Sequence, residues 1–377
     1  MNMIQSAKDQ IAALTRSAYR AAVQEGLLPD GVETVPAVEI PKDTANGDYT
    51  TTFCLAASKA MHKNPREVAA ILTQHMDLSG TYFTSVAIAG PGFLNFRLGE
   101  KWYADVIADM ERETDDYGRG EGLKGKKIMV EFVSANPTGP MHMGNARGGV
   151  LGDTLASVLD WSGADVWREF YVNDFGNQIE KFAKSIEARY FQIIKGEDAV
   201  EFPEDGYHGD DIKELAQAFY AEHGESYMDK TEAERHADMA RFGLAVREDS
   251  ENPVYYIQYA YARICSLLKT MADEGRGVPA ADKADLSLLS GEQERALIKE
   301  LANFSEEIRM AARDYDPSYI NRYLLRLAGA FHRFYNACRI KGEADDVANA
   351  RLLLAAATRQ VLANGLGILG LSKPEKM

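Results

Sequence analysis

A histidine bracketed by glycines has the clearest chemical use in this sequence. His142 lies in the string SANPTGPMHMGN, which follows the apolar run IMVEFV and precedes a helical pattern. A loop that leaves a parallel strand and enters a helix presents N–H groups and the positive end of the helix dipole to an anion. Gly139 and Gly144 let the backbone approach a ligand closely. The string therefore predicts a phosphate-binding loop, in which His142 donates a hydrogen bond to a phosphate oxygen as charge develops.

Such a loop suits adenylyl transfer, in which a carboxylate attacks the α-phosphate of a nucleotide. That reaction needs no general base, so fixed donors and positioning dominate its catalysis. The alternative is an ordinary glycine turn with His142 as a capping residue. The tetrapeptide HMGN alone favours that alternative, because four-residue patterns are weak evidence.

Three regions are expected to position or accompany this loop. Residues 1–115 contain a helical pattern that includes Ile4 and Ile11, a helix over residues 58–76, and strand patterns at SVAIAG and FLNFRL, which together predict a small α+β module. Residues 116–125 carry four glycines and several charges, and they predict a linker.

Residues 116–243 predict a partial Rossmann-like domain. The strings IMVEFV and ADVWREFYVND predict two strands around a helix at residues 144–160, with Leu151, Leu155 and Leu159 on one helix face. Residues 178–243 predict helices separated by an acidic loop. Residues 244–377 are helical almost throughout, which predicts a bundle. The expected fold class is therefore α/β plus all-α.

Composition excludes several other classes of protein. The 377 residues are 46% hydrophobic and 26% charged, which is ordinary for a globular protein, and no run of eighteen apolar residues predicts a membrane span. The three cysteines lie far apart without a CxxC motif, so we expect reduced thiols, no metal site and a cytoplasmic location. A net charge of −15 opposes indiscriminate binding of nucleic acid, although a local basic face is compatible with it.

The longer string EFVSANPTGPMHMGNARGGVLGD resembles the signature of class I aminoacyl-tRNA synthetases, in the version that arginyl-tRNA synthetases use. The strings YVNDFGNQI, GDYTTTFCLAASKAMHKNPREVAAIL, AGPGFLNFRL, ENPVYYIQYAYARICSLL and RLLLAAATRQVLANGLGILGLSKPEKM resemble the same family in order along the chain. The resemblance implies an N-terminal tRNA-contacting domain, a class I catalytic domain and a helical anticodon-binding domain. It also implies that the chain activates arginine with ATP, with Mg²⁺ as the counter-ion of ATP, and transfers it to its tRNA.

Site residues follow from the resemblance. His142 and Asn145 are the expected catalytic contacts, and the ATP-binding set is Pro140, His142, Gly144 and Asn145. Asn145 stands where the family more often has histidine, and its amide still donates a hydrogen bond. The expected arginine-binding residues are Ser134, Asn136, Asn173, Asp174 and Gln178. A role for Asp174 as a helix N-cap stays open beside the ligand role.

One expected catalytic element has no counterpart. The family carries a lysine-rich KMSK loop after the second half of its nucleotide fold, and no such string lies between Gln178 and Asn252. The junction falls near Gly243–Leu244. A sheet interrupted there should leave an unpaired edge and uncovered apolar surface. We therefore expect weakened catalysis, and a chain that self-associates through the exposed half-sheet, pairs with another protein or is poorly stable alone, although the family is monomeric.

The string NRYLLRLAGAFHRFYNACRIK predicts a tRNA-facing helix. Arg322, Arg326 and Arg333 share one helical stripe, opposite an apolar face. A solvated face with ion pairs to neighbouring helices is the alternative. Among nearby tyrosines, Tyr259 is a candidate for stacking on an anticodon base. The predicted partners are thus tRNA for arginine, arginine and ATP. A catalytically inactive tRNA-binding remnant of a synthetase is the alternative function.

Overall fold

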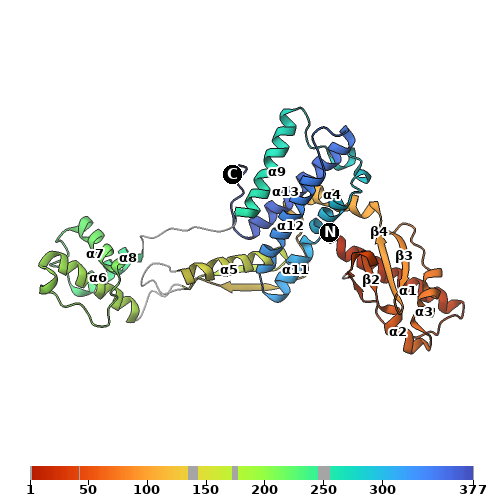
Figure 1. The fold of residues 1–377 in the computed structure, drawn as a ribbon. Coiled ribbons are helices and arrows are strands. Elements are labelled where there is room, and N and C mark those ends of the chain that lie inside the picture. Colours follow the sequence, from red (N-terminus) through yellow and green to blue (C-terminus); the bar gives the residue numbers. More distant parts are fainter. Residues whose placement is uncertain (1, 42, 135–142, 172–176, 245–254, 377) are drawn as a thin grey trace. The chain divides into compact units, whose positions relative to one another are not determined.

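The computed structural model describes residues 2–41, 43–134, 143–171, 177–244 and 255–376 (Figure 1). Contacts divide the chain into two compact units. The first unit comprises Met1–Lys124, Trp161–Gly163 and Val254–Met377, and the second comprises Gly125–Asp160 and Ala164–Pro253. The three regions expected from the sequence, with boundaries at residues 115 and 243, stay a prediction.

The first unit begins with a helix packed on a four-stranded antiparallel sheet. Helix α1 (Met3–Gln24) buries Ile4 and Ile11. The sheet has the order β1-β2-β4-β3, with β1 at Val38–Glu39, β2 at Tyr49–Thr51, β3 at Phe83–Ala89 and β4 at Phe93–Leu98. The strands expected at SVAIAG and FLNFRL are therefore confirmed, and so is the α+β character of this part.

The helix expected over residues 58–76 is wrong as a single element. The structure has α2 (Phe53–Met61) and α3 (Pro65–Gln74), separated at His62, whose backbone is left-handed with φ 50°. Asn64 caps α3 by accepting a hydrogen bond from the N–H of Arg66 at 2.9 Å. Pro65 has no N–H to donate to a preceding turn, so it begins a helix and cannot continue one.

The rest of the first unit is helical, which confirms the predicted bundle. Helix α4 (Glu100–Glu113) packs against α10 (Glu292–Ala302) and α13 (Asp345–Ile368), while α12 (Ser318–Ala337) packs against α9 (Tyr255–Asp273) and α11 (Phe304–Asp314). Short 3₁₀ turns lie at Thr44–Asn46, Thr114–Asp116, Ala281–Lys283 and Leu286–Leu288. A Cβ on Gly365 would lie 2.4 Å from Leu324, so α13 meets α12 closely because that position has no side chain.

Residues 116–125 include the boundary between the two compact units, which lies between Lys124 and Gly125, and the expectation of a linker here stays a prediction. Tyr117 is buried in the first unit, and its hydroxyl donates to the carbonyl of Leu301 at 3.4 Å. Gly118 has φ +103°, and a Cβ there would lie 2.5 Å from Phe304. The glycines of this segment therefore include one that allows close packing, which composition alone does not distinguish from linker glycines.

The second unit contains a parallel βαβ element. Strand β5 (Lys127–Glu131) pairs in parallel with β6 (Asp165–Glu169), and α5 (Met143–Trp161) connects them. This confirms the two strands and the helix predicted between them. In the register, Met129 is the partner of Trp167.

Helices follow in the second unit, as predicted, and three of them lie among the described residues. They are α6 (Asn177–Lys195), α7 (Asp210–His223) and α8 (Glu232–Leu244), with a 3₁₀ turn at Glu197–Ala199 after α6. Their shared core includes Phe182, Tyr190, Phe219 and Met239. Among the described residues, no helix is long and apolar enough to cross a membrane.

The parallel sheet of the second unit leaves large apolar side chains uncovered, as expected for an interrupted sheet. The sheet has two strands among the described residues. Met129 is 61% exposed and Trp167 is 66% exposed. On α5, Leu159 is buried whereas Leu151 is 57% exposed, so the predicted leucine face is covered only toward its C-terminal end.

Candidate functional site

The loop after β5 starts from a strained residue. Val133 has φ +60°, a left-handed conformation that a β-branched residue rarely adopts. The next residue, Ser134, accepts a hydrogen bond from the N–H of Tyr171 at 3.1 Å, which ties the segment after β5 to the segment after β6. Both segments leave the carboxyl ends of parallel strands, the edge at which α/β sheets bind ligands.

Helix α5 begins where the sequence predicts the phosphate contact. Gly144 and Asn145 lie in its first turn, where helix N–H groups and the helix dipole favour an anion. The helix approaches the segment after β5 closely. A Cβ on Gly149 would lie 2.8 Å from Val133, and one on Gly152 would lie 2.3 Å from Phe132.

Several predicted site residues lie outside the described residues. They are Asn136, Pro140, His142, Asn173 and Asp174. The backbone of Gln178 lies in the first turn of α6. Ser134, Gly144 and Asn145 belong to one βαβ element within the described residues. The roles assigned to all of these residues stay predictions.

Sequence reasoning did not single out Arg168, which connects β6 to α5. Its Nε donates to Oδ1 of Asp153 at 2.8 Å, and its guanidinium also donates to the hydroxyl of Ser157 at 2.9 Å. Both partners lie one turn apart on α5. Arg168 therefore helps to position α5 on the sheet. Its only sequence signal is an arginine within a predicted strand.

The predicted basic stripe on α12 is exposed, and part of its charge is paired. Arg322, Arg326 and Arg333 are exposed, while the opposite face is buried, with Leu324, Leu327, Phe331 and Phe334 in the core. Arg322 lies 3.5 Å from Asp316. Arg326 contacts Glu307 and lies 3.9 Å from Glu300. The helix geometry is as expected, and the contribution of this stripe to tRNA binding stays a prediction.

An aromatic and basic cluster joins α9 to α12. Tyr259 is 39% exposed, and its ring centroid lies 6.0 Å from that of His332. Burial lowers the pKa of His332, and the nearby Arg263 lowers it further. The guanidinium of Arg263 stacks 4.3 Å from the ring centroid of Tyr335. His332, Arg263 and Tyr335 were missed by sequence reasoning, because their proximity depends on packing between helices far apart in the chain.

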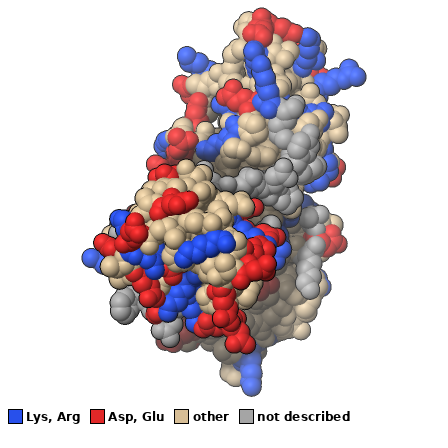
Figure 2. Space-filling model, turned by 90° about the vertical axis from the view of Figure 1, so that its left-hand side faces the viewer, with Lys and Arg blue, Asp and Glu red and all other residues tan. Residues whose placement is uncertain are grey.

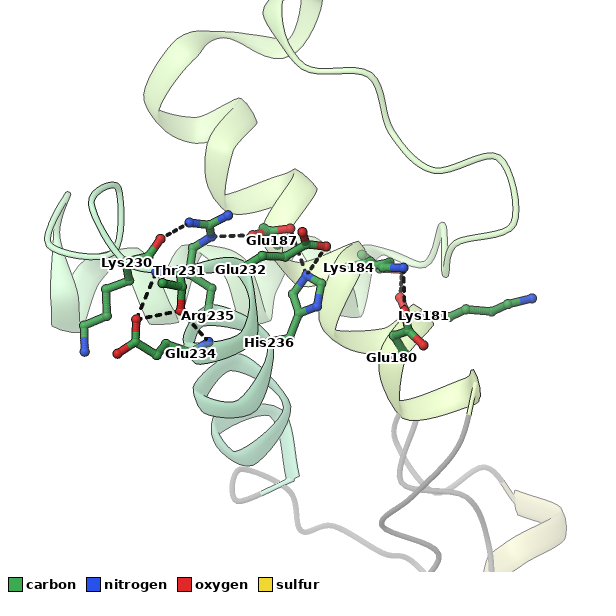
Figure 3. Close-up of polar contacts among 11 residues, drawn as sticks. Glu180, Lys181, Lys184, Glu187, Lys230, Thr231, Glu232, Glu234, Arg235 and His236 are labelled. Carbon is green, nitrogen blue, oxygen red and sulfur yellow. Dashed lines mark hydrogen bonds and ion pairs between the residues drawn. The ribbon is translucent and has the colours of Figure 1, made fainter.

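Helices α6 and α8 are joined by a charged network in the second unit. Figure 3 shows Glu187 between Arg235 and His236: one carboxylate oxygen accepts from Arg235, and the other lies 2.9 Å from Nε2 of His236. On the face drawn in Figure 2, basic side chains are interspersed with acidic ones and do not gather into a continuous patch.

The described residues contain no cluster of three His, Cys, Asp or Glu side chains that could hold a metal ion. All three cysteines are free, with Cys54 and Cys338 buried and Cys265 partly buried. Burial raises the pKa of the Cys54 thiol to about 12. Cys54 is therefore a protonated core residue at neutral pH and not a nucleophile.

Three family descriptions match successive parts of the chain. The arginyl tRNA synthetase N terminal domain matches residues 6–98, the class I (R) tRNA synthetase catalytic domain matches residues 114–273, and the DALR anticodon binding domain matches residues 257–377. The catalytic match includes β5, the loop after it, α5 and β6.

Curated relatives match over the whole chain. The arginine--tRNA ligase of Acetivibrio thermocellus is 34% identical, and that of Ruminiclostridium cellulolyticum is 31% identical, each over an alignment of 562 residues that covers 100% of both chains. This chain has 377 residues, so those relatives carry a long stretch without a counterpart here.

Solved structures share the fold. The arginyl-tRNA synthetase of Thermus thermophilus is 17% identical with a TM-score of 0.60, covering 97% of this chain and 99% of that chain. That of Plasmodium falciparum is 13% identical with a TM-score of 0.62, covering 98% and 99%. With family matches along the chain and a relative aligned from end to end, this chain belongs to the arginine--tRNA ligase family of class I aminoacyl-tRNA synthetases.

Proposed function

We propose that this chain uses ATP to activate arginine and transfers it to its tRNA, with the second unit holding ATP and arginine. The observation that carries this proposal is the βαβ element, in which α5 begins at Met143 and has Gly144 and Asn145 in its first turn. ATP enters as substrate with Mg²⁺ as its counter-ion. The proposed activity takes place in the cytoplasm, where tRNA is charged.

The proposed chemistry is adenylyl transfer. The carboxylate of arginine attacks the α-phosphate of ATP, the bond to pyrophosphate breaks, and no proton has to be removed from the nucleophile. The first turn of α5 would favour the negative charge of the phosphates, and Asn145 would donate its amide hydrogen. Ser134, Asn136, Asn173, Asp174 and Gln178 are assigned to arginine, and His142 and Pro140 to ATP.

A second function is favoured by one specific observation. The sheet of the second unit has two strands among the described residues, whereas a doubly wound fold binds its nucleotide between two halves. Each fixed donor in a transition-state site contributes about 10²- to 10³-fold in rate. Without the KMSK loop, the chain would then hold tRNA and charge it slowly or not at all.

The test of activity is arginine-dependent exchange of pyrophosphate into ATP, measured with tRNA for arginine supplied. We expect exchange that is slower than that of a full-length relative by about 10²- to 10³-fold. Exchange at the rate of the relative would show that the KMSK loop is dispensable. Absence of exchange with folded protein would reject ligation and leave the tRNA-binding function.

The test of tRNA binding is a filter-binding titration at several salt concentrations. Arg322→Gln and Arg333→Gln remove exposed charges from the α12 stripe. If each side chain contacts a phosphate, each change should weaken tRNA binding. Each change should also reduce the slope of log affinity against log salt concentration by about 1. Arg313→Gln is the matched control, because Arg313 is also exposed but lies on α11 and pairs with Asp314 at 2.7 Å. Equal effects of all three variants would refute the role of the stripe.

Self-association through the exposed half-sheet is the remaining part of the proposal. It is supported by the exposed pair Met129 and Trp167, which are register partners on neighbouring strands. Exposed apolar side chains at an unpaired sheet edge favour pairing with another chain.

A further inference from the structure

Strand β5 has an outer edge that points away from β6. The N–H of Phe132 donates to the carbonyl of Glu169 at 3.2 Å. Because N–H groups of successive strand residues point to opposite edges, the backbone groups of Lys127, Met129 and Glu131 point to the outer edge. All three residues are exposed. Among the described residues, β6 is the one strand paired with β5.

The sequence of this edge, KIMVE, is self-complementary when two copies run antiparallel. With the two-fold axis at Met129, Lys127 of each copy faces Glu131 of the other, and Ile128 faces Val130. Opposite charges and apolar pairs directly across an antiparallel ladder stabilise it, whereas like charges destabilise it. An axis at Lys127 or at Glu131 would instead bring two like charges face to face.

The edge of β6 lacks this complementarity. Its sequence is DVWRE. An axis at Trp167 would place Asp165 opposite Glu169, and an axis at Arg168 would bring two guanidinium groups together. Charge pairing therefore favours β5 over β6 as the contact between copies.

We propose that two copies of this chain pair through β5 in antiparallel orientation, centred on Met129, to form a continuous four-stranded sheet. This inference specifies the self-association proposed above and is independent of tRNA binding. Met129 and Trp167 are register partners, and they are 61% and 66% exposed. Pairing would align the two methionines and two tryptophans in one row across the sheet. The charges favour a second copy of this chain as the partner, because the strand is complementary to itself.

The strength of this contact is limited by its length. The ladder has five residues on each side. An interface of this size lies below the standard for stable complexes, so the dimer should form reversibly with a dissociation constant of about 1 µM or higher.

The test is sedimentation equilibrium of the full chain from about 1 to 100 µM, a range that brackets the expected dissociation. The wild-type mass should rise from 41.7 kDa toward twice that value. Lys127→Glu and Glu131→Lys each create facing like charges, so each variant alone should remain at 41.7 kDa. An equimolar mixture of the two variants should recover the dimer, because each charge then faces its opposite.

The controls make the same charge changes away from the edge. Lys213→Glu and Glu214→Lys alter exposed positions on α7 and should dimerise like the wild type. Circular dichroism and tRNA affinity should be unchanged in all variants, so loss of the dimer is distinguishable from loss of fold or of tRNA binding. A wild-type monomer over the whole range, dimers that persist in both single variants, or a mixture that stays monomeric would each overturn the proposal.

Discussion

Replacing Gly152 with alanine should loosen the packing of α5, whereas the same change at Gly148 should stabilise α5. Both glycines lie within α5. A Cβ on Gly152 would lie 2.3 Å from Cβ of Phe132 and 2.4 Å from its Cγ. Those atoms are near the backbone, so they cannot rotate away. A Cβ on Gly148 meets nothing within 4 Å.

The two substitutions share the gain in helix propensity and differ in the cost of packing. Alanine favours a helix interior over glycine by about 1 kcal/mol, and this gain applies at both positions. Overpacking against Phe132 costs about 1–3 kcal/mol at Gly152 alone. The difference between the variants therefore isolates the packing cost, which corresponds to about a 5- to 150-fold difference in an equilibrium constant.

Amide hydrogen exchange of peptides from α5 measures this difference locally. Gly148→Ala should slow exchange relative to wild type, and Gly152→Ala should exchange about 5- to 150-fold faster than Gly148→Ala. Peptides from the first unit should exchange equally in both variants. Equal protection of α5 in the two variants would refute the close packing of α5 on the segment after β5.

Two further predictions concern other parts of the structure. Thr231→Ala should destabilise α8 by about 1 kcal/mol, because Thr231 and Glu234 form a capping box. The hydroxyl and the N–H of Thr231 donate to the Glu234 carboxylate at 2.7 and 3.0 Å. Faster amide exchange in α8 would show the loss, and unchanged exchange would contradict it. A hydrogen bond to the carbonyl of Ile71 raises the pKa of His75 above 6.5, and a hydrogen bond to Glu25 makes a smaller contribution in the same direction. Protonated His75 therefore stabilises the folded chain. This stabilisation is complete below pH 6.5 and is lost as pH rises through the folded-state pKa. His75→Gln should therefore lower the urea midpoint near pH 6 more than near pH 9, and an equal effect at both would refute the assignment.

Local sequence signals were sufficient where one element decides its own structure. The run IMVEFV followed by a glycine-rich loop predicted β5 and α5, because an apolar run and helical spacing each depend on nearby residues. The division between α2 and α3 was also encoded locally, in the Asn64–Pro65 pair, and was overlooked because apolar spacing continues on both sides.

Other features depend on packing between distant segments. Arg326 is paired with Glu300 and Glu307, which lie on α10 and α11, so the sequence of α12 alone could not show that its charge is partly neutralised. Burial raises the pKa of Glu300, and the adjacent Arg326 opposes that shift. Tyr117 lies among glycines, and its burial against the bundle is likewise invisible in the local sequence.

The two units allow binding and chemistry to be assigned separately. The basic stripe on α12 belongs to the first unit, and the βαβ element belongs to the second. The relatives align over 562 residues with this chain of 377, and the half-sheet of the second unit exposes Met129, Trp167 and Leu151. An interruption of the nucleotide fold accounts for both facts. It leaves intact the helices that we propose to face tRNA, so tRNA affinity should survive even where pyrophosphate exchange is lost. Salt-dependent tRNA binding without pyrophosphate exchange would thus show that the interruption affects catalysis alone. Loss of both tRNA binding and exchange would indicate a defect in the fold of the first unit.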